Sequence, residues 1–511
     1  MSPLRIVFRT DANQQIGTGH FMRCLTLADE LRLRNTEICF VARGLPPHLQ
    51  RMLTERSIQY VALPKPDGKQ DTDELPYATW LLTSQAHDAE QTLAALGTDT
   101  WDWLVLDHYS LDQRFETPLR KVCKHVMVID DLADRVHDCD VLLDQNFYQN
   151  KDQRYLGKVP ADCRLLLGPS FALLRPAFKE IRHQVKARTG KVKTLLVFFG
   201  GVDADNLTGQ VLDVLISLNL AVQVNVVIGQ LHPQKEKIEQ ICFQHGYACH
   251  VQTSQMARLM AVADLAIGAG GTTVWERCAM GLPSVCIATA ENQQQQLHDL
   301  QSAGLIVGPT SEEDPMKFLS SYLNGMSAES KSLQAQSERV MALVDGRGAE
   351  RVATVPMAHV MQLRLAEAED ARTIFQWRNH PLVRNHSVDT QEISWDEHRQ
   401  WFEHHLKKNI GPILIGEFKN KPVGVVRFDI SNQEATVSIY LVPESGFKGW
   451  GGCLLEQAEY WLRQHHPEVL TLHARVLPNN EPSKKLFAKL NYTLNANQAH
   501  FEFAKDLEAC T

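Results

Sequence analysis

Over the N-terminal part of the chain, short apolar runs alternate with amphipathic segments. The runs are rich in β-branched and aromatic residues, which is typical of buried strands. They predict strands at residues 4–8, 38–41, 101–107, 126–130 and 141–144. Between the first two runs, apolar residues recur at helical spacing from Phe21 to Leu31. The alternation predicts a parallel sheet, in which ligands bind beyond the carboxyl ends of the strands.

A second unit of the same kind follows a polar, basic stretch at residues 184–193, which we interpret as a linker. Its apolar runs predict strands at residues 194–199, 222–228, 265–267 and 283–287. The unit is expected to end near Val355. The pattern therefore predicts an α/β fold class with two Rossmann-like lobes, at residues 1–187 and 188–355.

The pattern changes from about residue 362 onward. A short strand and a helix at residues 370–379 come first. The alternating runs that follow predict an antiparallel meander, with strands at residues 413–417, 422–428 and 435–442. A glycine cluster, a helix from Cys453, a strand at 469–476 and a last helix complete the pattern. We therefore expect a compact α+β domain at residues 362–511.

Composition narrows the class of protein. A chain of 511 residues is too long for one core, and its 22% charged residues are ordinary for a globular protein. The net charge of −8 argues against a protein that binds nucleic acids or membrane surfaces in general. No run is long enough for a membrane span or typical of a signal peptide. The 11 cysteines include no CxxC pair, so we expect reduced thiols, no structural zinc and a cytoplasmic protein.

A first glycine site lies between the first strand and the first helix. Gly17 and Gly19 allow positive φ angles and a close approach of the backbone to a ligand. The helix behind them offers free N–H groups to an anion. His20 stands where that helix begins, so its imidazole is expected to face the ligand. A structural histidine is the alternative interpretation.

A second glycine site follows the strand at residues 265–267. Its sequence, GAGGTTVWE, places four small residues directly after that strand and a carboxylate inside the helix that follows. The loop amides suit a diphosphate, and Glu276 is placed to accept hydrogen bonds from both ribose hydroxyls. The spacing is neither the GxGxxG of NAD enzymes nor a Walker loop. It favours a nucleotide-sugar site, with a solvated Glu276 as the alternative.

Both lobes resemble the hydrolases of pseudaminic acid biosynthesis, which cleave UDP-2,4-diacetamido-2,4,6-trideoxy-β-L-altropyranose. The matching segments are RTDANQQIGTGHFMRC, LDHY, LLRPAF, GGVDADN, GAGGTTVWE and ENQ. The resemblance implies a GT-B arrangement of the two lobes. That family is similar in turn to the glycosyltransferase that makes lipid II.

The resemblance implies that His20 is the general base that activates water for C–O cleavage at the anomeric carbon, with UDP leaving. Tyr109 and Asn292 match family positions that contact the sugar or the water. The implied substrate-binding residues are Gly17, Gly19, Arg23, Arg175, Asp203, Asn206, Gly270, Gly271, Thr272, Thr273, Glu276 and Gln293. A glycosyltransferase that uses the same base remains an alternative. So does a metal-dependent hydrolase using His108, Asp130 and Asp131, although we expect no metal.

The C-terminal region resembles the GNAT family of acetyl-CoA-dependent N-acetyltransferases. The segment VPESGFKGWGG joins a strand to a helix, and its successive amides suit a pyrophosphate. The motifs Trp377-Arg378-Asn379 and Trp401-Phe402 resemble the branch that acetylates ribosomal-protein N-termini and nucleotide amino-sugars. The resemblance implies that acetyl-CoA is bound by Leu441, Val442, Gly446, Lys448, Gly449, Gly451 and Asn480.

This region departs from the family pattern at two positions. Gly446 stands where the family usually has Gln or Arg, and Phe487 stands where a tyrosine often protonates the leaving thiolate. Tyr492 or Tyr440 is an alternative acid, and CoA leaving without a dedicated acid is another.

The fusion of the two regions predicts two successive reactions. The GNAT domain would acetylate the 4-amino group of UDP-4-amino-4,6-dideoxy-N-acetyl-β-L-altrosamine with acetyl-CoA. The GT-B domain would then hydrolyse the resulting UDP-2,4-diacetamido-2,4,6-trideoxy-β-L-altropyranose. The expected partners are therefore a UDP-amino-sugar and acetyl-CoA. The alternative is a GT-B glycosyltransferase or binding module fused to a protein N-terminal acetyltransferase.

Overall fold

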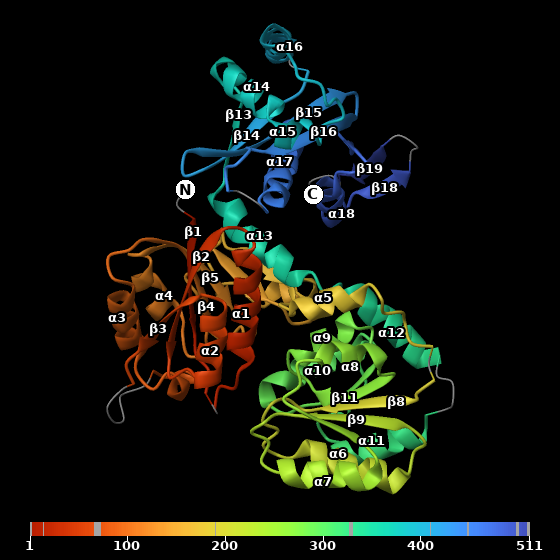
Figure 1. Ribbon diagram of the computed structural model, residues 1–511. Coiled ribbons are helices and arrows are strands. Elements are labelled where there is room, and N and C mark those ends of the chain that lie inside the picture. The colour runs from red at the N-terminus through yellow and green to blue at the C-terminus, as the bar shows by residue number, and fades with distance from the viewer. Residues whose placement is uncertain are drawn as a thin grey trace. The chain divides into compact units, whose positions relative to one another are not determined.

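The structure is a computed structural model. It describes residues 3–13, 15–65, 73–189, 191–326, 331–408, 410–446, 449–496 and 500–507. The chain forms two compact units, which are drawn in Figure 1. The larger unit comprises Arg5–Glu30 and Ile38–Val352, and the C-terminal unit comprises Met1–Leu4, Leu31–Glu37 and Ala353–Thr511.

The first lobe is built on a seven-stranded sheet of order β3-β2-β1-β4-β5-β6-β7. The strands are β1 (Leu4–Thr10), β2 (Thr36–Arg43), β3 (Gln59–Leu63), β4 (Trp101–Asp107), β5 (Cys123–Ile129), β6 (Val141–Asp144) and β7 (Arg164–Leu167). Its helices are α1 (Gly19–Arg32), α2 (Pro47–Glu55), α3 (Gln85–Leu96) and α4 (Gln113–Leu119), with short 3₁₀ turns η1 (Ala78–Trp80), η2 (Lys151–Gln153) and η3 (Pro169–Phe171). β1 and β4 pair in parallel, so Thr10 and Asp107 lie side by side at the carboxyl edge.

The second lobe has a five-stranded parallel sheet of order β10-β9-β8-β11-β12. The strands are β8 (Thr194–Phe198), β9 (Gln223–Ile228), β10 (Ala248–Val251), β11 (Leu265–Ala269) and β12 (Ser284–Ile287). The helices are α5 (Pro176–Arg182), α6 (Leu207–Leu218), α7 (Lys235–His245), α8 (Met256–Val262), α9 (Thr273–Ala279), η4 (Glu291–Gln293), α10 (Gln294–Ser302), α11 (Pro315–Asn324) and α12 (Lys331–Leu343). Helix α13 (Gly348–Val360) begins in the larger unit and ends in the C-terminal unit.

Each lobe has its own apolar core, as the two runs of strands predict. Leu104 and Phe115 are buried in the first, and Leu196 and Trp275 in the second. The core of the second lobe also contains Phe178 of α5. Helix α5 therefore packs with the second lobe, although it precedes the polar stretch at residues 184–193.

Three strands of the two lobes lie outside the expected ones, namely β3, β7 and β10. They are four or five residues long and only partly buried. Short edge strands lack the continuous apolar run that marks a central parallel strand, which explains why the pattern did not reveal them.

The C-terminal unit contains a mixed seven-stranded sheet of order β13-β14-β15-β16-β17-β19-β18. The strands are β13 (Gln362–Leu365), β14 (Ile413–Phe418), β15 (Lys421–Ser431), β16 (Glu434–Leu441), β17 (Thr471–Val476), β18 (Thr493–Ala496) and β19 (Phe501–Asp506). The helices are η5 (Ala368–Asp370), α14 (Ala371–Asn379), α15 (Pro381–Arg384), α16 (Trp395–Lys408), α17 (Gly451–His465) and α18 (Glu481–Lys489). The expected meander is confirmed, but the hairpin β18–β19 after the last helix was not expected.

Strands β16 and β17 diverge within this sheet. They pair in parallel only from Glu434 to Thr436, opposite Thr471 to His473. Beyond Thr436, β16 pairs with β15 alone among the strands described, while β17 pairs with β19 on its other side. Main-chain groups of alternate residues within 437–441, those that point away from β15, therefore lack a strand partner among the strands described. Unpaired backbone groups need partners, so an extended ligand can bind there.

The fold class is confirmed in these three regions: two Rossmann-like lobes followed by a domain with a mixed sheet. Within the part of the chain that the structure describes, no helix is both long enough and apolar enough to cross a membrane.

Candidate active site

The first glycine loop closes on itself before α1 begins. Gly17 has a φ of 77° and its N–H donates to the carbonyl of Asn13 at 2.8 Å. A residue with a side chain is strained at such an angle, which accounts for the glycine. Gly19 is the first residue of α1, and His20 lies in its first turn with 9% of its surface exposed. The loop therefore presents an almost buried imidazole.

His20 is held by a carboxylate at the end of the neighbouring strand. Its Nδ1 lies 2.6 Å from Oδ1 of Asp107, the last residue of β4. Arg23, one turn further along α1, donates to Oδ2 at 2.6 Å and to Oδ1 at 2.7 Å. An ionised carboxylate only accepts hydrogen bonds, so it places the imidazole proton on Nδ1 and leaves Nε2 free to accept one.

The electrostatics of the site keep Asp107 ionised. Burial alone would raise the pKa of its carboxyl, but the charge of Arg23 and the contact with His20 more than offset burial. The net result is a pKa well below the usual range for aspartate.

Tyr109 and Asp131 extend the same network. The Tyr109 hydroxyl donates to Oδ1 of Asp131 at 2.5 Å, and Arg23 donates to Oδ2 of Asp131 at 3.1 Å. The Tyr109 ring meets the His20 ring edge-on, with centroids 4.5 Å apart. Burial and then the Asp131 charge raise the pKa of Tyr109 well above its usual value, so the phenol stays protonated. Arg23 thus orients the site, because its guanidinium is bonded to both aspartates.

Two further aromatic rings border His20 and were not predicted. Trp80 stacks on Tyr109 with centroids 5.6 Å apart, and Tyr77 lies 4.7 Å from Trp80. Trp80 also meets the His20 ring at 6.4 Å. The tertiary structure brings four further residues to the site, namely Asp107, Asp131, Tyr77 and Trp80. Only Asp107 and Asp131 had a sequence signal, since both lie at predicted strand ends.

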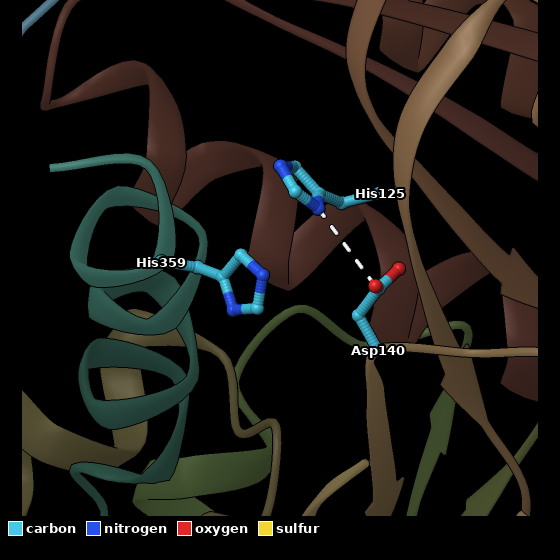
Figure 2. A group of neighbouring side chains, drawn as sticks. All are labelled: His125, Asp140 and His359. Atoms are coloured by element: carbon cyan, nitrogen blue, oxygen red, sulfur yellow. Dashed lines mark ion pairs between the residues drawn. The ribbon is translucent and has the colours of Figure 1, made fainter. Parts of the chain in front are cut away.

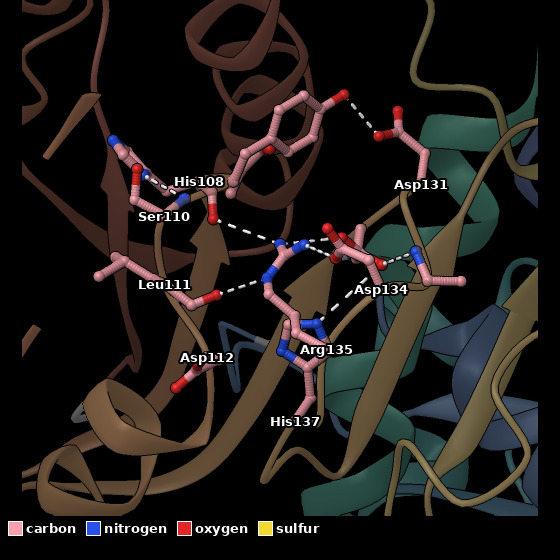
Figure 3. A network of polar contacts seen from close by, with 12 residues as sticks. His108, Ser110, Leu111, Asp112, Asp131, Asp134, Arg135 and His137 are labelled. Carbon is pink, nitrogen blue, oxygen red and sulfur yellow. Dashed lines mark hydrogen bonds and ion pairs between the residues drawn. The ribbon is translucent and has the colours of Figure 1, made fainter. Parts of the chain in front are cut away.

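The aspartates and the histidine of the metal-dependent alternative have separate partners. Asp130 pairs with Arg135 at 2.9 Å, and Figure 3 shows Arg135 also bound to the carbonyl of Leu111. His108 faces Asp11 at 3.2 Å, while Asp131 is bonded as described above. Each of the three side chains therefore has its own partner within the protein.

A second histidine–aspartate pair lies at the opposite edge of the sheet. His125, near the start of β5, faces Asp140 at 3.8 Å, as Figure 2 shows. Asp140 also accepts hydrogen bonds from the N–H of Val126 and from Arg120. His359, drawn in the same figure, belongs to the C-terminal unit. Since ligands of parallel sheets bind at the carboxyl edge, the pair His125–Asp140 holds strands in place.

The second glycine loop runs from β11 into α9, as predicted. A Cβ on Gly270 would come within 2.8 Å of the Leu297 side chain, so a larger residue there would require Leu297 to move. Gly271, Thr272 and Thr273 follow, and Thr273 begins the helix. Arg277 donates to the carbonyl of Ala269 at 2.7 Å and secures the loop from behind.

Glu276 is mostly buried and has one charged partner. Arg175, just before α5, donates to its Oε1 at 2.9 Å. Burial raises the pKa of Glu276, and Arg175 opposes that rise. The interpretation of Glu276 as a solvated helix residue is therefore wrong, because only 14% of its side chain is exposed.

Other expected substrate residues lie in loops of the second lobe. Asp203 caps α6 by accepting from the N–H groups of Leu207 and Thr208, and Asn206 accepts from that of Gly209. Asn292 is exposed in η4, and Gln293 accepts a hydrogen bond from the N–H of Thr289 at 3.0 Å. These contacts shape the loops. The roles of the four residues toward a substrate stay predictions.

The expected acetyl-CoA residues begin at the diverging end of β16. Leu441 is its last residue, and the N–H of Val442 donates to the carbonyl of Val423 at 2.9 Å. Gly446 and Gly449 have φ angles of 73° and 88°, and Gly451 begins α17. Lys448 lies outside the described residues. The positive φ angles meet the expectation for an amide-lined turn before a helix.

Asn480 is a helix cap in this structure. Its Oδ1 accepts from the N–H of Ser483 at 3.1 Å, and its Nδ2 donates to the carbonyl of His386 at 3.2 Å. It therefore fixes both the start of α18 and the segment after α15. A direct contact with acetyl-CoA stays a prediction.

The alternative proton donors differ in their partners. Phe487 is buried against Tyr492 and Phe503. The Tyr492 hydroxyl donates to Glu459 at 2.9 Å, whereas the buried Tyr440 hydroxyl has no hydrogen-bond partner among the described residues. Tyr440 lies on the diverging part of β16, and burial raises its pKa although Arg378 and Arg427 oppose the rise. Tyr440 is thus the tyrosine free to donate.

Comparisons with known proteins find matches in both the GT-B region and the C-terminal region. Residues 194–349 match the family model of the glycosyltransferase family 28 C-terminal domain. Residues 361–493 match the model of the acetyltransferase (GNAT) domain. An uncharacterised protein of Methanocaldococcus jannaschii is 22% identical over 503 residues, which cover 96% of each chain.

Two Campylobacter jejuni enzymes are also similar to parts of the chain. The UDP-2,4-diacetamido-2,4,6-trideoxy-β-L-altropyranose hydrolase is 24% identical over 294 residues, which cover 57% of this chain and 94% of that protein. Acetyltransferase PseH is 25% identical over 141 residues, which cover 27% of this chain and 85% of that protein. The resemblance stated from the sequence motifs is thereby confirmed for a UDP-sugar hydrolase and a GNAT acetyltransferase.

Proposed function

We propose that this chain catalyses two successive reactions of pseudaminic acid biosynthesis. The C-terminal unit acetylates the 4-amino group of UDP-4-amino-4,6-dideoxy-N-acetyl-β-L-altrosamine with acetyl-CoA. The two lobes then hydrolyse UDP-2,4-diacetamido-2,4,6-trideoxy-β-L-altropyranose to UDP and the free sugar. Similarity to one enzyme of each activity supports the pairing, because the product of the first reaction is the substrate of the second.

The observation that carries the hydrolase is the contact between His20 and Asp107. With its proton fixed on Nδ1, His20 accepts the proton of a water molecule at Nε2 as the water attacks the anomeric carbon. The C–O bond to UDP breaks, and the bonding electrons leave with the nucleotide. Asp107 stabilises the imidazolium that forms, as the buried carboxylate of other histidine-based sites does.

The second lobe would hold the leaving nucleotide. The glycine loop before α9 offers amides to the diphosphate, and Glu276 accepts hydrogen bonds from the ribose hydroxyls. Arg175 donates to Glu276 and opposes the rise in its pKa that burial causes, which favours the carboxylate that accepts both. Tyr109, held by Asp131, and Asn292 are assigned to the sugar and the attacking water.

For the acetyl transfer, the opening between β16 and β17 suits an extended arm such as pantetheine. Backbone groups of Leu441 and Val442 would bind it, and the turn with Gly446, Gly449 and Gly451 would hold the pyrophosphate. The 4-amino group attacks the thioester carbonyl, a C–N bond forms and the C–S bond breaks. We assign Tyr440 as the proton donor to the departing thiolate; the absence of a hydrogen-bond partner for its hydroxyl among the described residues supports this.

The test is to incubate the full chain with the UDP-4-amino sugar and acetyl-CoA while following CoA and UDP release separately. CoA release is expected first, and UDP release only after acetylation. In water labelled with oxygen-18, the label is expected in the sugar, since the C–O bond is broken. UDP release that requires an added alcohol acceptor would identify a glycosyltransferase, and acetylation of peptide N-termini alone would refute the first reaction.

A further inference from the structure

The C-terminal unit contains three arginines whose charges act on one another. Arg378 lies in the last turn of α14, Arg384 ends α15, and Arg427 lies in β15; we call them the arginine cluster. Burial lowers the pKa of Arg378, the Asp389 charge opposes that effect, and the charges of Arg427 and Arg384 lower the pKa further. Guanidinium groups repel one another, so the cluster depends on anionic partners.

Groups of the protein itself bind only some of the hydrogen-bond donors of the arginine cluster. Arg378 donates through Nη2 to a backbone carbonyl, that of Asp389, at 2.7 Å. Arg384 pairs with Glu392 at 3.0 Å, and Arg427 pairs with Asp429 at 2.8 Å. Arg378 therefore has no carboxylate among the hydrogen-bond partners that the described residues provide.

Buried donor atoms in the cluster also lack hydrogen-bond partners. They are Nη1 of Arg378, Nε of Arg384 and Nε of Arg427, together with the neighbouring hydroxyl of Tyr440. A buried donor without a partner costs free energy, and native proteins leave few of them. Several unpartnered buried donors within one group of side chains indicate a binding site whose ligand accepts these hydrogen bonds.

The sheet register places this cluster beside the opening for acetyl-CoA. Arg427 is paired with Ser438 and Val425 with Tyr440, on the part of β16 that has diverged from β17. Val425 and Arg427 are two residues apart in β15 and so point to the same face. On that face Val425 packs with Ile374 of α14 and Phe402 of α16. The cluster thus lies on the face of the sheet covered by α14, next to the proposed acetyl-transfer site.

We propose that the arginine cluster binds the diphosphate of the UDP-linked amino sugar at the acetyltransferase site. This inference rests on the proposed function, because it names the residues that recognise its first substrate. A nucleotide-sugar diphosphate carries two negative charges, and guanidinium groups donate to phosphate oxygens in pairs. The contact would hold the nucleotide while the amino sugar extends toward Tyr440 and the thioester.

The first experiment measures CoA release by the full chain with the UDP-amino sugar as acceptor. Arg378→Gln and Arg427→Gln are each expected to raise KM for the UDP-amino sugar about tenfold, the value of one charged hydrogen bond. KM for acetyl-CoA should stay the same. Arg378→Lys should recover part of the loss, because it keeps the charge but not the paired donors. Arg399→Gln, an exposed arginine of α16, is the matched control and should change neither constant.

Inhibition separates the sources of the anion. UDP should compete with the UDP-amino sugar far better than uridine does, and the two Gln variants should weaken that competition. Equal inhibition by uridine and UDP would overturn the inference, as would a rise in KM for acetyl-CoA alone. Thermal unfolding of each variant shows whether it folds, and Arg427→Gln serves if Arg378→Gln does not.

Calorimetry with UDP as the probe makes the test independent of turnover. We expect two UDP sites per chain, one lost in the double variant Arg378→Gln/Arg427→Gln and the other in Glu276→Gln. If the wild-type chain binds two UDP molecules but acetylates no UDP-amino sugar, the proposed function is refuted. The arginine cluster then still stands as a diphosphate-binding site. A single site, abolished by Glu276→Gln alone, would refute the arginine cluster as a diphosphate site.

Discussion

The site around His20 and the site around Tyr440 are built in opposite ways. In the first, His20, Arg23, Asp107, Asp131 and Tyr109 form a chain of hydrogen bonds among themselves. In the second, the Tyr440 hydroxyl and one nitrogen of each neighbouring arginine are buried without partners. A complete network fixes the orientation and protonation of a catalytic base before substrate arrives. In an incomplete network the ligand supplies the missing hydrogen bonds, so the network serves to recognise that ligand.

The largest expected effect comes from His20→Ala. UDP release should fall about 10³-fold, because the water loses its general base, while CoA release should stay the same. Both rates are measured on the full chain with the same UDP-sugar. His48→Ala, an exposed histidine of α2, is the control and should match the wild type. Unchanged UDP release in His20→Ala would refute the assignment of the base.

Asp107→Asn tests whether the network itself matters. UDP release should fall about 10²-fold, since the amide neither fixes the Nδ1 proton nor stabilises the imidazolium. The variant should also lose about 3 kcal/mol of stability at pH 7, because Arg23 is left buried beside a neutral side chain.

The stability difference between wild type and Asp107→Asn is also expected to depend on pH. The pKa of Asp107 lies below its unfolded value, so its stabilisation is present above about pH 4 and is lost as the pH falls through the folded pKa. The difference in free energy of unfolding between wild type and Asp107→Asn should therefore narrow from pH 7 to pH 3. Urea titrations across this range measure it, and a constant difference would contradict the assignment.

Tyr440→Phe sharpens the comparison on the acetyltransferase side. It removes an unpartnered hydroxyl, so the stability should change little, while kcat for CoA release should fall about tenfold if that hydroxyl protonates the thiolate. Tyr492→Phe is the matched control: it breaks the bond to Glu459 and should lower stability rather than kcat. Equal kcat in wild type and Tyr440→Phe would mean that CoA leaves without this acid.

Asn480→Ala should have the smallest effect. Loss of the cap of α18 is expected to cost about 1 kcal/mol of stability. If Asn480 also contacts acetyl-CoA, KM for acetyl-CoA rises in addition. Asn480→Ser keeps a capping oxygen, so it should restore stability, and it should restore KM only if the cap alone matters.

The two sites also differ in how far the sequence predicts them. Gly17, His20, Gly270 and Glu276 stand in local patterns in which a strand, a small-residue loop and a helix follow one another, and the structure has these elements in the predicted order. Tyr77 and Trp80 carry no such pattern, because aromatic residues in irregular segments are common. Residues 378, 427 and 440 lie on separate elements: register sets β15 and β16 side by side, and the packing of α14 against β15 adds residue 378.

Local sequence thus determined the order of strands and helices, the glycine turns and the position of His20 at a helix start. These follow from the spacing of apolar residues and from backbone freedom at glycine, which act over a few neighbouring positions. The tertiary structure decided that Asp107 orients His20, that Asn480 donates to the carbonyl of His386, and that Arg378 lies near β15. Such contacts join residues far apart in the chain, where pairing depends on register and burial rather than on sequence spacing.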